Sequence, residues 1–305
     1  MTSPAGSPPQ ASFPAESALA LLSETRCFGG AHRRYRHHSR QLDCAMVFGV
    51  FLPPQALAGD SVPAVYWLSG LTCTDENASQ KAGAQRLAAE LGLALVLPDT
   101  SPRGPEVPGD PDGGWDFGHG AGFYADASAE PWSRHYRMHS YVVEELPALL
   151  EAKLPIRSDR RGLTGHSMGG HGALVCGLRH PGRYASVSAF APIAHPSLCP
   201  WGRKAFGHLL GSDPAPWAAW DTCALLETGT TLRGPDGELL PLLVDQGTAD
   251  PFLAEQLRPH DLETACRAAG QPLELRLQQG YDHSYFFIAS FIDDHLRHHA
   301  RALIG

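Results

Sequence analysis

The sequence predicts one α/β domain built on a mostly parallel sheet of about eight strands, with helices on both faces. Three observations support this fold class. From residue 62 onward, apolar runs of strand length alternate with segments of helical periodicity, a pattern typical of parallel sheets covered on both sides. The 305 residues contain no internal repeat and no linker, so one domain is expected over 23–305. Residues 1–22 are rich in Pro, Ser and Ala and are expected to form a disordered tail.

The expected elements follow in order along the chain. An antiparallel pair comes first, at 31–39 and 44–52. The later strands are expected at 62–69, 93–99, 160–164, 184–192, 239–247 and 272–278, and the helices near 79–91, 136–153, 167–180, 203–226, 252–270 and 284–300. Gly92 and Pro181-Gly182 follow two of these helices, as helix-ending residues do. Pro147 should kink or divide the helix in which it lies.

A long loop rich in glycine and proline covers residues 99–135. Loops of this length in compact domains are commonly lids or binding loops, or are disordered. The aromatic residues of this loop favour a packed conformation, and they are Trp115, Phe117, Phe123, Tyr124 and Trp132.

Composition excludes several classes of function. The formal net charge is −8, which argues against a nucleic-acid-binding protein. The short basic run 33–38 is better explained as a solvated strand than as an anion site. Seven cysteines without a C-x-x-C motif argue against a disulfide framework or a zinc ribbon and favour a reducing compartment. The sequence shows no membrane-spanning stretch and no signal peptide, so a cytoplasmic protein is expected.

The stretch GLTGHSMGGHGALV, residues 162–175, carries the strongest chemical signal. Residues 165–169 fit G-x-S-x-G, the nucleophile elbow of α/β-hydrolases, with Ser167 at its apex. A short strand is expected before the motif and a helix after it, as an elbow requires. The glycines make room for two closely passing backbone arms, and Gly172 lets the helix approach its neighbours. A phosphate-binding turn or plain helix packing is the alternative, and the flanking elements favour catalysis.

A serine hydroxyl is a weak nucleophile and needs a histidine base that is oriented by an acid. In α/β-hydrolases the chain order is serine, acid, histidine. His283 follows the expected strand 272–278, where the base belongs in this fold. His166 and His171 neighbour Ser167, but elbow geometry does not direct their side chains at its hydroxyl.

The acid has two candidates in the required interval, Asp245 at the end of the strand 239–247 and Asp250 on the following turn. Residue positions alone do not separate them. Asp282 is adjacent to His283, and neighbours in an extended loop tend to point apart. His295, His298 and His299 share the last helix, and they are better explained as solvated cations near its C-terminus than as metal ligands.

The second donor of an oxyanion hole is expected from the loop Ser69-Gly70-Leu71-Thr72-Cys73. Gly70 permits a bent backbone, so the N–H of Leu71 is a candidate beside the N–H of Met168. Losing one such donor costs about 3–4 kcal/mol of transition-state stabilisation.

Several long segments resemble S-formylglutathione hydrolase, also called esterase D. They include YWLSGLTCTDEN, WDFGHGAGFYADA, GHSMGGHGAL and QGYDHSYFFIASFIDDHLRHHA, and the resemblance runs from about Cys27 to the C-terminus. The family implied is a cytoplasmic α/β-hydrolase that cleaves S-formylglutathione to formate and glutathione, in glutathione-dependent formaldehyde removal. It also resembles carboxylesterases that accept small activated esters.

The resemblance assigns roles to residues. It implies Ser167 as nucleophile, His283 as base and Asp250 as acid, because DQGTADPF aligns with the family's loop after the strand. It places Cys73 near the active site as a thiol that is sensitive to reagents but not catalytic. It implies no metal, no other cofactor and a homodimer. The candidates for pocket wall and glutathione contacts, for which core packing is the alternative, are Trp115, Asp116, Phe117 and Tyr124.

Two departures and three rival functions stay open. The tail 1–22 is additional, and the segment 226–241 is longer and more hairpin-like than the family pattern. A broad carboxylesterase or an acyltransferase would use the same fold, and a non-catalytic binding protein would lack a member of the triad.

Overall fold

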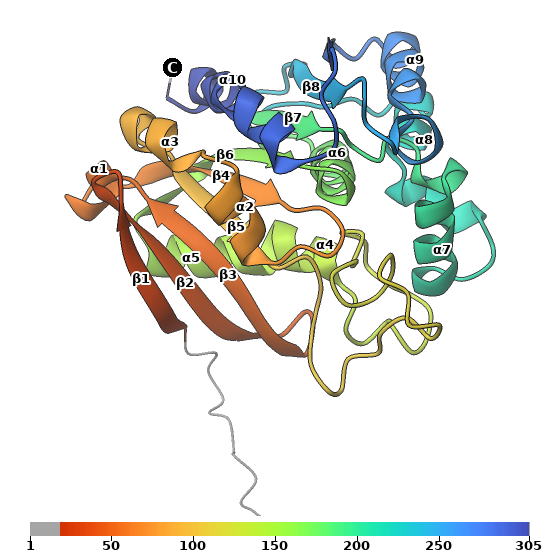
Figure 1. The fold of residues 1–305 in the computed structure, drawn as a ribbon, viewed down its shortest axis with the longest axis horizontal. Coiled ribbons are helices and arrows are strands. Elements are labelled where there is room, and N and C mark those ends of the chain that lie inside the picture. The colour runs from red at the N-terminus through yellow and green to blue at the C-terminus, as the bar shows by residue number, and fades with distance from the viewer. Residues whose placement is uncertain (1–18, 305) are drawn as a thin grey trace, which may run out of the picture.

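The computed structural model describes residues 19–304, and its centre is a nine-stranded sheet in the order β1-β2-β3-β5-β4-β6-β7-β8-β9 (Figure 1). The first three strands and β5 pair antiparallel, and from β5 through β4 to β9 all pairs are parallel. The α/β class and the mostly parallel sheet are therefore confirmed. The strands are β1 (Ala20–Cys27), β2 (Gly30–Ser39), β3 (Cys44–Leu52), β4 (Val62–Leu68), β5 (Ala94–Pro98), β6 (Ile156–Gly165), β7 (Ser186–Phe190), β8 (Leu242–Gly247) and β9 (Leu273–Gln278).

Helices cover both faces of the sheet. On the face toward the viewer of Figure 1, α10 contacts both α2 and α3, and α5 and α6 lie behind the sheet. The helices are α1 (Pro54–Leu57), α2 (Asp75–Lys81), α3 (Gln85–Leu91), α4 (Met138–Ser140), α5 (Leu146–Lys153), α6 (Met168–Arg179), α7 (Pro200–Leu209), α8 (Thr222–Glu227), α9 (Pro259–Ala269) and α10 (Tyr285–Leu303). In the described part of the chain, no helix has the length and apolar character needed to cross a bilayer.

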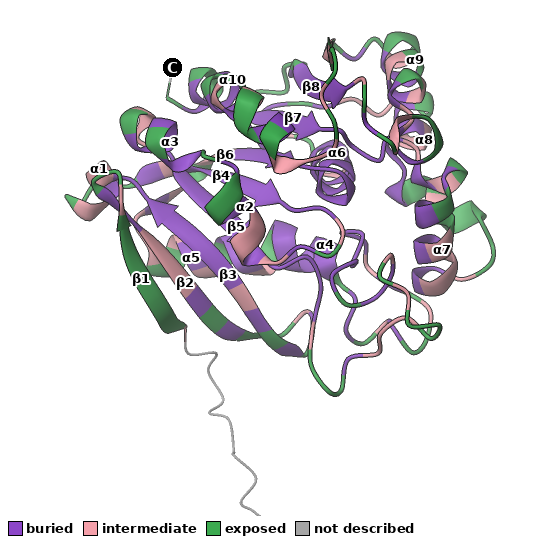
Figure 2. Cartoon of the chain, in the orientation of Figure 1, coloured by how far each residue is buried: buried purple, intermediate pink, exposed green. Residues whose placement is uncertain are grey.

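The ninth strand, β1, is the main difference from the predicted topology. It begins at Ala20, so residues 20–22 of the expected tail belong to the sheet, while residues 1–18 lie outside the described part. Seven of its eight residues are exposed, as the green colour of β1 in Figure 2 shows. An edge strand without a buried face leaves no alternation of apolar and polar residues, and this is the signal on which strand prediction depends.

Several expected helices are divided in the structure. The pattern 79–91 corresponds to α2 and α3, with Gly83 at φ 73° between them. The pattern 136–153 is divided as expected, because α5 begins at Leu146 with Pro147 in its first turn. In the segment 226–241, an isolated antiparallel bridge joins Arg233 and Leu239, in agreement with the expected hairpin-like character.

The parallel strands bring the predicted catalytic residues to one edge of the sheet. Ser167 follows β6, Asp250 follows β8 and His283 follows β9. Since β6, β7, β8 and β9 run parallel as neighbours, their carboxyl ends share this edge, where ligands bind in open α/β sheets. Every residue of β7 and β8 beneath this edge is buried, as the purple colour in Figure 2 shows.

Candidate active site

Ser167 lies at the apex of a sharp turn between β6 and α6. Its φ of 59° and ψ of −121° put a non-glycine residue in a strained backbone region, as a nucleophile elbow requires. The Ser167 N–H donates to the carbonyl oxygen of Phe190 at 3.0 Å, and the Ser167 carbonyl accepts from the N–H of His171 at 3.0 Å. These bonds hold the turn between β7 and the first turn of α6.

The glycines of the motif are required by close backbone contacts. A methyl group on Gly165 would overlap the Gly169 carbonyl, and one on Gly169 would overlap the Leu68 carbonyl in β4. A methyl group on Gly172 would lie 2.5 Å from the ring of Tyr124. The expected role of these glycines, which is to let backbone and helix pass closely, agrees with this geometry.

His283 is held by Asp250. Their Nδ1 and Oδ2 atoms are 2.5 Å apart, so Nδ1–H donates to the carboxylate and Nε2 is left free to accept a proton. The other carboxylate oxygen of Asp250 accepts from the N–H of Phe252 at 2.8 Å, and Gln246 contacts Oδ2 at 3.3 Å. Asp250 is buried, with 5% of its surface exposed. This carboxylate therefore fixes both the tautomer and the orientation of the imidazole.

The other two acid candidates have different partners. Asp245 forms an ion pair with Arg276 and accepts from Nε2 of His295 at 3.0 Å. Burial opposes its ionisation, but the hydrogen bonds from His295 and Arg276 prevail and lower the pKa of Asp245 to about 2. Asp282 accepts from the hydroxyl and the N–H of Ser284 at the start of α10. Of the three candidates, Asp250 is the one that contacts His283.

A cleft of about 260 Å³ opens over the serine. Ser167 and His283 both line it, which brings the nucleophile and the base of the prediction into one cavity. Besides the predicted Trp115, three aromatic residues that were not predicted line it, and they are Trp201, Phe252 and Tyr285. The complete lining is Gly70, Leu71, Thr72, Cys73, Trp115, His166, Ser167, Trp201, Phe252, His283 and Tyr285.

The loop after β4 passes directly against the nucleophile. A methyl group on Gly70 would lie 3.0 Å from Cβ of Ser167. Among the described residues, the N–H groups of Leu71 and Met168 donate to no protein acceptor, whereas the N–H of Thr72 donates to the Gly120 carbonyl at 2.8 Å. Both predicted oxyanion donors are therefore available to a ligand.

Of the four residues predicted to contact the substrate, only Trp115 lines the cleft. Trp115 lines the cleft, is 56% exposed and packs edge-on against Trp201. Asp116 lies 2.5 Å from Nζ of Lys204 in an ion pair and is not part of the lining.

Phe117 and Tyr124 are corrections, because both are core residues and neither lines the cleft. The ring of Phe117 stacks on His208. The hydroxyl of Tyr124 donates to the Ser69 carbonyl at 2.9 Å, and its ring packs on Gly172. For these two residues, packing in the core is the explanation that the structure supports.

Cys73 and His166 complete the floor of the cleft. Burial raises the pKa of the Cys73 thiol, and its Sγ lies 3.9 Å from the hydroxyl of Tyr285. Burial, together with the neighbouring His283, lowers the pKa of His166 well below its ordinary value. The two imidazole rings have centroids 4.3 Å apart, so a neutral His166 packs beside the base without adding a charge.

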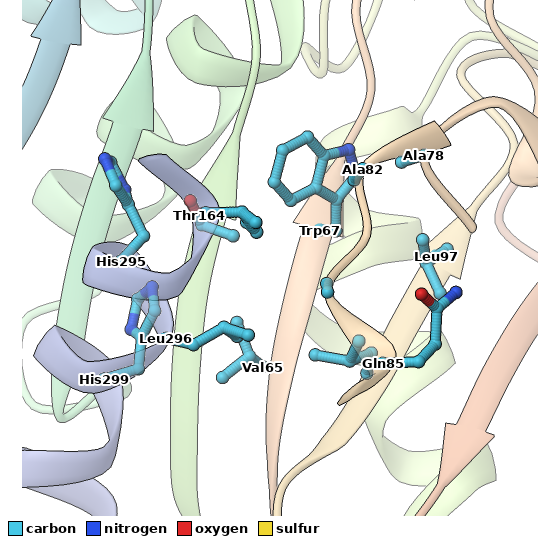
Figure 3. A pocket seen from close by; sticks show the side chains of 13 residues that line it. Val65, Trp67, Ala78, Ala82, Gln85, Leu97, Thr164, His295, Leu296 and His299 are labelled. Atoms are coloured by element: carbon cyan, nitrogen blue, oxygen red, sulfur yellow. The ribbon is translucent and has the colours of Figure 1, made fainter. Parts of the chain in front are cut away.

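The environment of the histidines in α10 also differs from the prediction. His295, His298 and His299 are all buried rather than solvated, and His295 and His299 line a small cavity of about 10 Å³ beneath α10 (Figure 3). His295 contacts the hydroxyl of Ser188 at 2.8 Å, and His299 contacts that of Ser186 at 2.6 Å. In residues 19–304, no cluster of three or more potential metal ligands occurs.

Comparison with known proteins identifies the family of this chain. The family model Esterase matches residues 39–298. A Mus musculus protein named S-formylglutathione hydrolase is 52% identical over 287 residues, which are 94% of this chain and 99% of that protein. A solved S-formylglutathione hydrolase from Agrobacterium tumefaciens has 47% identity and a TM-score of 0.88, covering 93% of this chain and 99% of its own.

A more distant structure shows the fold alone. The S-formylglutathione hydrolase FrmB from Staphylococcus aureus is 16% identical, with a TM-score of 0.65, and the match covers 93% of this chain and 100% of that one. On the strength of the family match and the closer relatives, the chain belongs to the esterase family and, within it, to the S-formylglutathione hydrolases.

Proposed function

We propose that the protein hydrolyses S-formylglutathione to formate and glutathione, in the removal of formaldehyde. One observation carries the proposal. His283, bound to Asp250 at 2.5 Å, shares a cleft with Ser167 in a chain that is 52% identical to a relative named S-formylglutathione hydrolase. These three residues are the catalytic triad of the proposal.

The first half of the reaction is acyl transfer to the enzyme. His283 takes the proton of Ser167 as its hydroxyl oxygen attacks the formyl carbon, and Asp250 stabilises the imidazolium that forms. The N–H groups of Leu71 and Met168 donate to the oxyanion of the tetrahedral intermediate. The carbon–sulfur bond then breaks, and glutathione leaves as a thiolate that takes the proton of the His283 imidazolium, so that the imidazole is neutral again.

The second half of the reaction releases formate. Water gives a proton to the neutral His283 as it attacks the formyl ester, and His283 returns this proton to the Ser167 oxygen as the intermediate collapses. A formyl group is the smallest acyl group, so a tight acyl site selects it. The backbone at Gly70 packs closely on the Cβ side of Ser167, which supports such a site.

Compartment and assembly are further parts of the proposal. All seven cysteines are free and six of them are buried, which supports a reducing compartment such as the cytoplasm. We propose a homodimer on the resemblance to the family. Analytical ultracentrifugation at micromolar concentration tests this, and a single sedimenting species of monomer mass contradicts it.

The deciding experiment compares two substrates. Purified protein is expected to show a higher kcat/KM for S-formylglutathione than for p-nitrophenyl acetate. Ser167→Ala should reduce both by about 10⁴-fold or more while circular dichroism and Tm stay close to wild type. An equal or higher kcat/KM for the ester favours a broad carboxylesterase, and unchanged turnover in the Ser167→Ala variant refutes the nucleophile.

A further inference from the structure

The cleft has no place inside it for the charges of glutathione. Its lining contains no lysine, arginine, aspartate or glutamate. Glutathione carries a glycine carboxylate at one end and a glutamyl ammonium and carboxylate at the other. Because an unpaired charge is costly to bury, these groups must lie at the rim of the cleft while the thioester reaches Ser167. This reasoning rests on the proposed function.

On one side of the cleft, the rim carries a cation without a counterion. Lys81 is the exposed last residue of α2, which follows directly after the oxyanion loop. Its Nζ lies 5.9 Å from the ring centroid of Tyr285, a residue of the cleft wall. Among the described residues, Lys81 forms no ion pair. Its charge is therefore available to a bound anion.

On another side of the cleft, the rim carries a net negative charge. Lys204 in α7 lies 2.6 Å from Asp110 and 2.5 Å from Asp116, so this group carries one net negative charge. It adjoins the cleft through Trp115, the residue before Asp116, and through Trp201 in α7. Figure 1 shows α2 and α7 well apart, with the loop after β4 between them.

We propose that Lys81 binds the glycine carboxylate of the glutathionyl group and so sets the orientation of the tripeptide in the cleft. The glycine end bears a bare negative charge, which suits an unpaired ammonium. The glutamyl end bears an ammonium as well, which Lys81 repels and the acidic group at Asp110 and Asp116 attracts. The cysteinyl thioester then lies between the two rims, over Ser167.

The expected effect is small, because the ion pair is exposed to solvent. Exposed pairs of this kind change an equilibrium by about two- to five-fold, and salt weakens them further. Lys81 is therefore a specificity-determining residue, whose removal should raise KM for S-formylglutathione and change kcat little. Replacement by glutamate should have a larger effect, about ten-fold, because attraction becomes repulsion.

The experiment pairs a change in the enzyme with a change in the substrate. Wild type, Lys81→Ala, Lys81→Arg and Lys81→Glu are assayed with S-formylglutathione and with its glycine carboxamide. Lys153→Ala, at the exposed end of α5, is the matched control. Wild type, Lys81→Arg and Lys153→Ala should prefer the carboxylate about two- to five-fold in kcat/KM. Lys81→Ala should lose this preference, and Lys81→Glu should reverse it.

The outcomes separate this inference from the proposed function. If wild type turns over S-formylglutathione but Lys81→Ala keeps the full preference for the carboxylate, the inference is overturned and the proposed function stands. If wild type does not turn over S-formylglutathione, the proposed function fails and the inference fails with it.

Discussion

The stability of the protein should fall steeply between about pH 7 and pH 5.5, because histidines are buried in its core. Burial lowers the pKa of His139 to about 3 and that of His171 to about 4. Burial, helped by the neighbouring His295, lowers the pKa of His298 to about 4. In the unfolded chain the same side chains titrate with the ordinary pKa of about 6.5.

The sign and size of the effect follow from proton linkage. Below about pH 6.5 the unfolded chain binds protons at these three residues and the folded chain does not, so stability falls as pH falls. Each histidine costs about 1.2 kcal/mol between pH 7 and 5.5, which gives about 4 kcal/mol for the three. The loss levels off below about pH 4 for His171 and His298 and below about pH 3 for His139, where the folded protein also binds these protons. A domain of ordinary stability, about 5–15 kcal/mol, loses a large fraction of it.

Urea denaturation at fixed ionic strength over this pH range measures the effect. His298→Gln should reduce the loss of stability between pH 7 and 5.5 by about 1.2 kcal/mol, since this group no longer titrates. His260→Gln is the control, because the His260 side chain is 77% exposed in the folded protein and should leave the slope unchanged. A free energy of unfolding that stays constant within about 1 kcal/mol over the range would refute the reasoning.

Two further pairs of variants test the site and the elbow. Asp250→Asn should lower kcat by about 10²–10⁴-fold with little change in Tm, because the imidazole loses its orienting acceptor. Asp245→Asn should instead cost about 3–5 kcal/mol of stability, measured by urea denaturation, and keep kcat per folded molecule, because it removes a buried partner of Arg276. Gly169→Ala should prevent folding or abolish activity through overlap with the carbonyl of Leu68, as soluble expression and circular dichroism will show. Gly207→Ala, in α7 with open space around its Cα, should be stabilising by about 0.5–1 kcal/mol, and equal tolerance of both alanines would contradict the close backbone contact.

The elbow could be predicted because its signal is local. The five residues 165–169 contain both the nucleophile and the glycines that its sharp turn requires. The close contacts of Gly165 and Gly169 are made within these five residues or with the neighbouring strand β4. The alternating apolar segments likewise predicted the parallel part of the sheet, where strands are buried on both faces. The edge strand β1 has no buried face and therefore gave no pattern.

The choice of the acid depended on register, which residue order does not contain. Asp245 lies within β8 and Asp250 on the turn that follows it, and β8 pairs with β9 so that Asp245 lies opposite Arg276. That pairing occupies Asp245, whereas the turn after β8 carries Asp250 to His283. Both aspartates lie between Ser167 and His283 in the chain, so residue order could not decide which of them is the acid. The resemblance of the segment DQGTADPF to the family was needed for that choice.

The walls of the cleft were the least predictable part, because they come from separate segments of the chain. Trp201, Phe252 and Tyr285 lie on α7, on the turn after β8 and at the start of α10. Within the long loop, Phe123 and Tyr124 both have φ near 50°, an unusual backbone that directs the Tyr124 ring toward Gly172 instead of the substrate. Consecutive non-glycine residues with positive φ have no sequence signature.

The long loop 99–135 is hydrogen-bonded to the segment that carries the predicted oxyanion donor Leu71, so it supports that segment rather than acting as a lid. Its Gly120 carbonyl accepts from the N–H of Thr72, and its Tyr124 hydroxyl donates to the Ser69 carbonyl, so it holds both ends of the segment that presents Leu71. The N–H of Phe123, the residue before Tyr124, donates to the sulfur of Met168 at 3.4 Å. One loop thus braces both predicted oxyanion donors. Donors that are fixed before the substrate arrives need no reorganisation when charge develops, and this is where oxyanion stabilisation has its largest effect. Tyr124, which the sequence offered as a candidate for substrate contact, is therefore expected to support catalysis through the backbone that it holds in place.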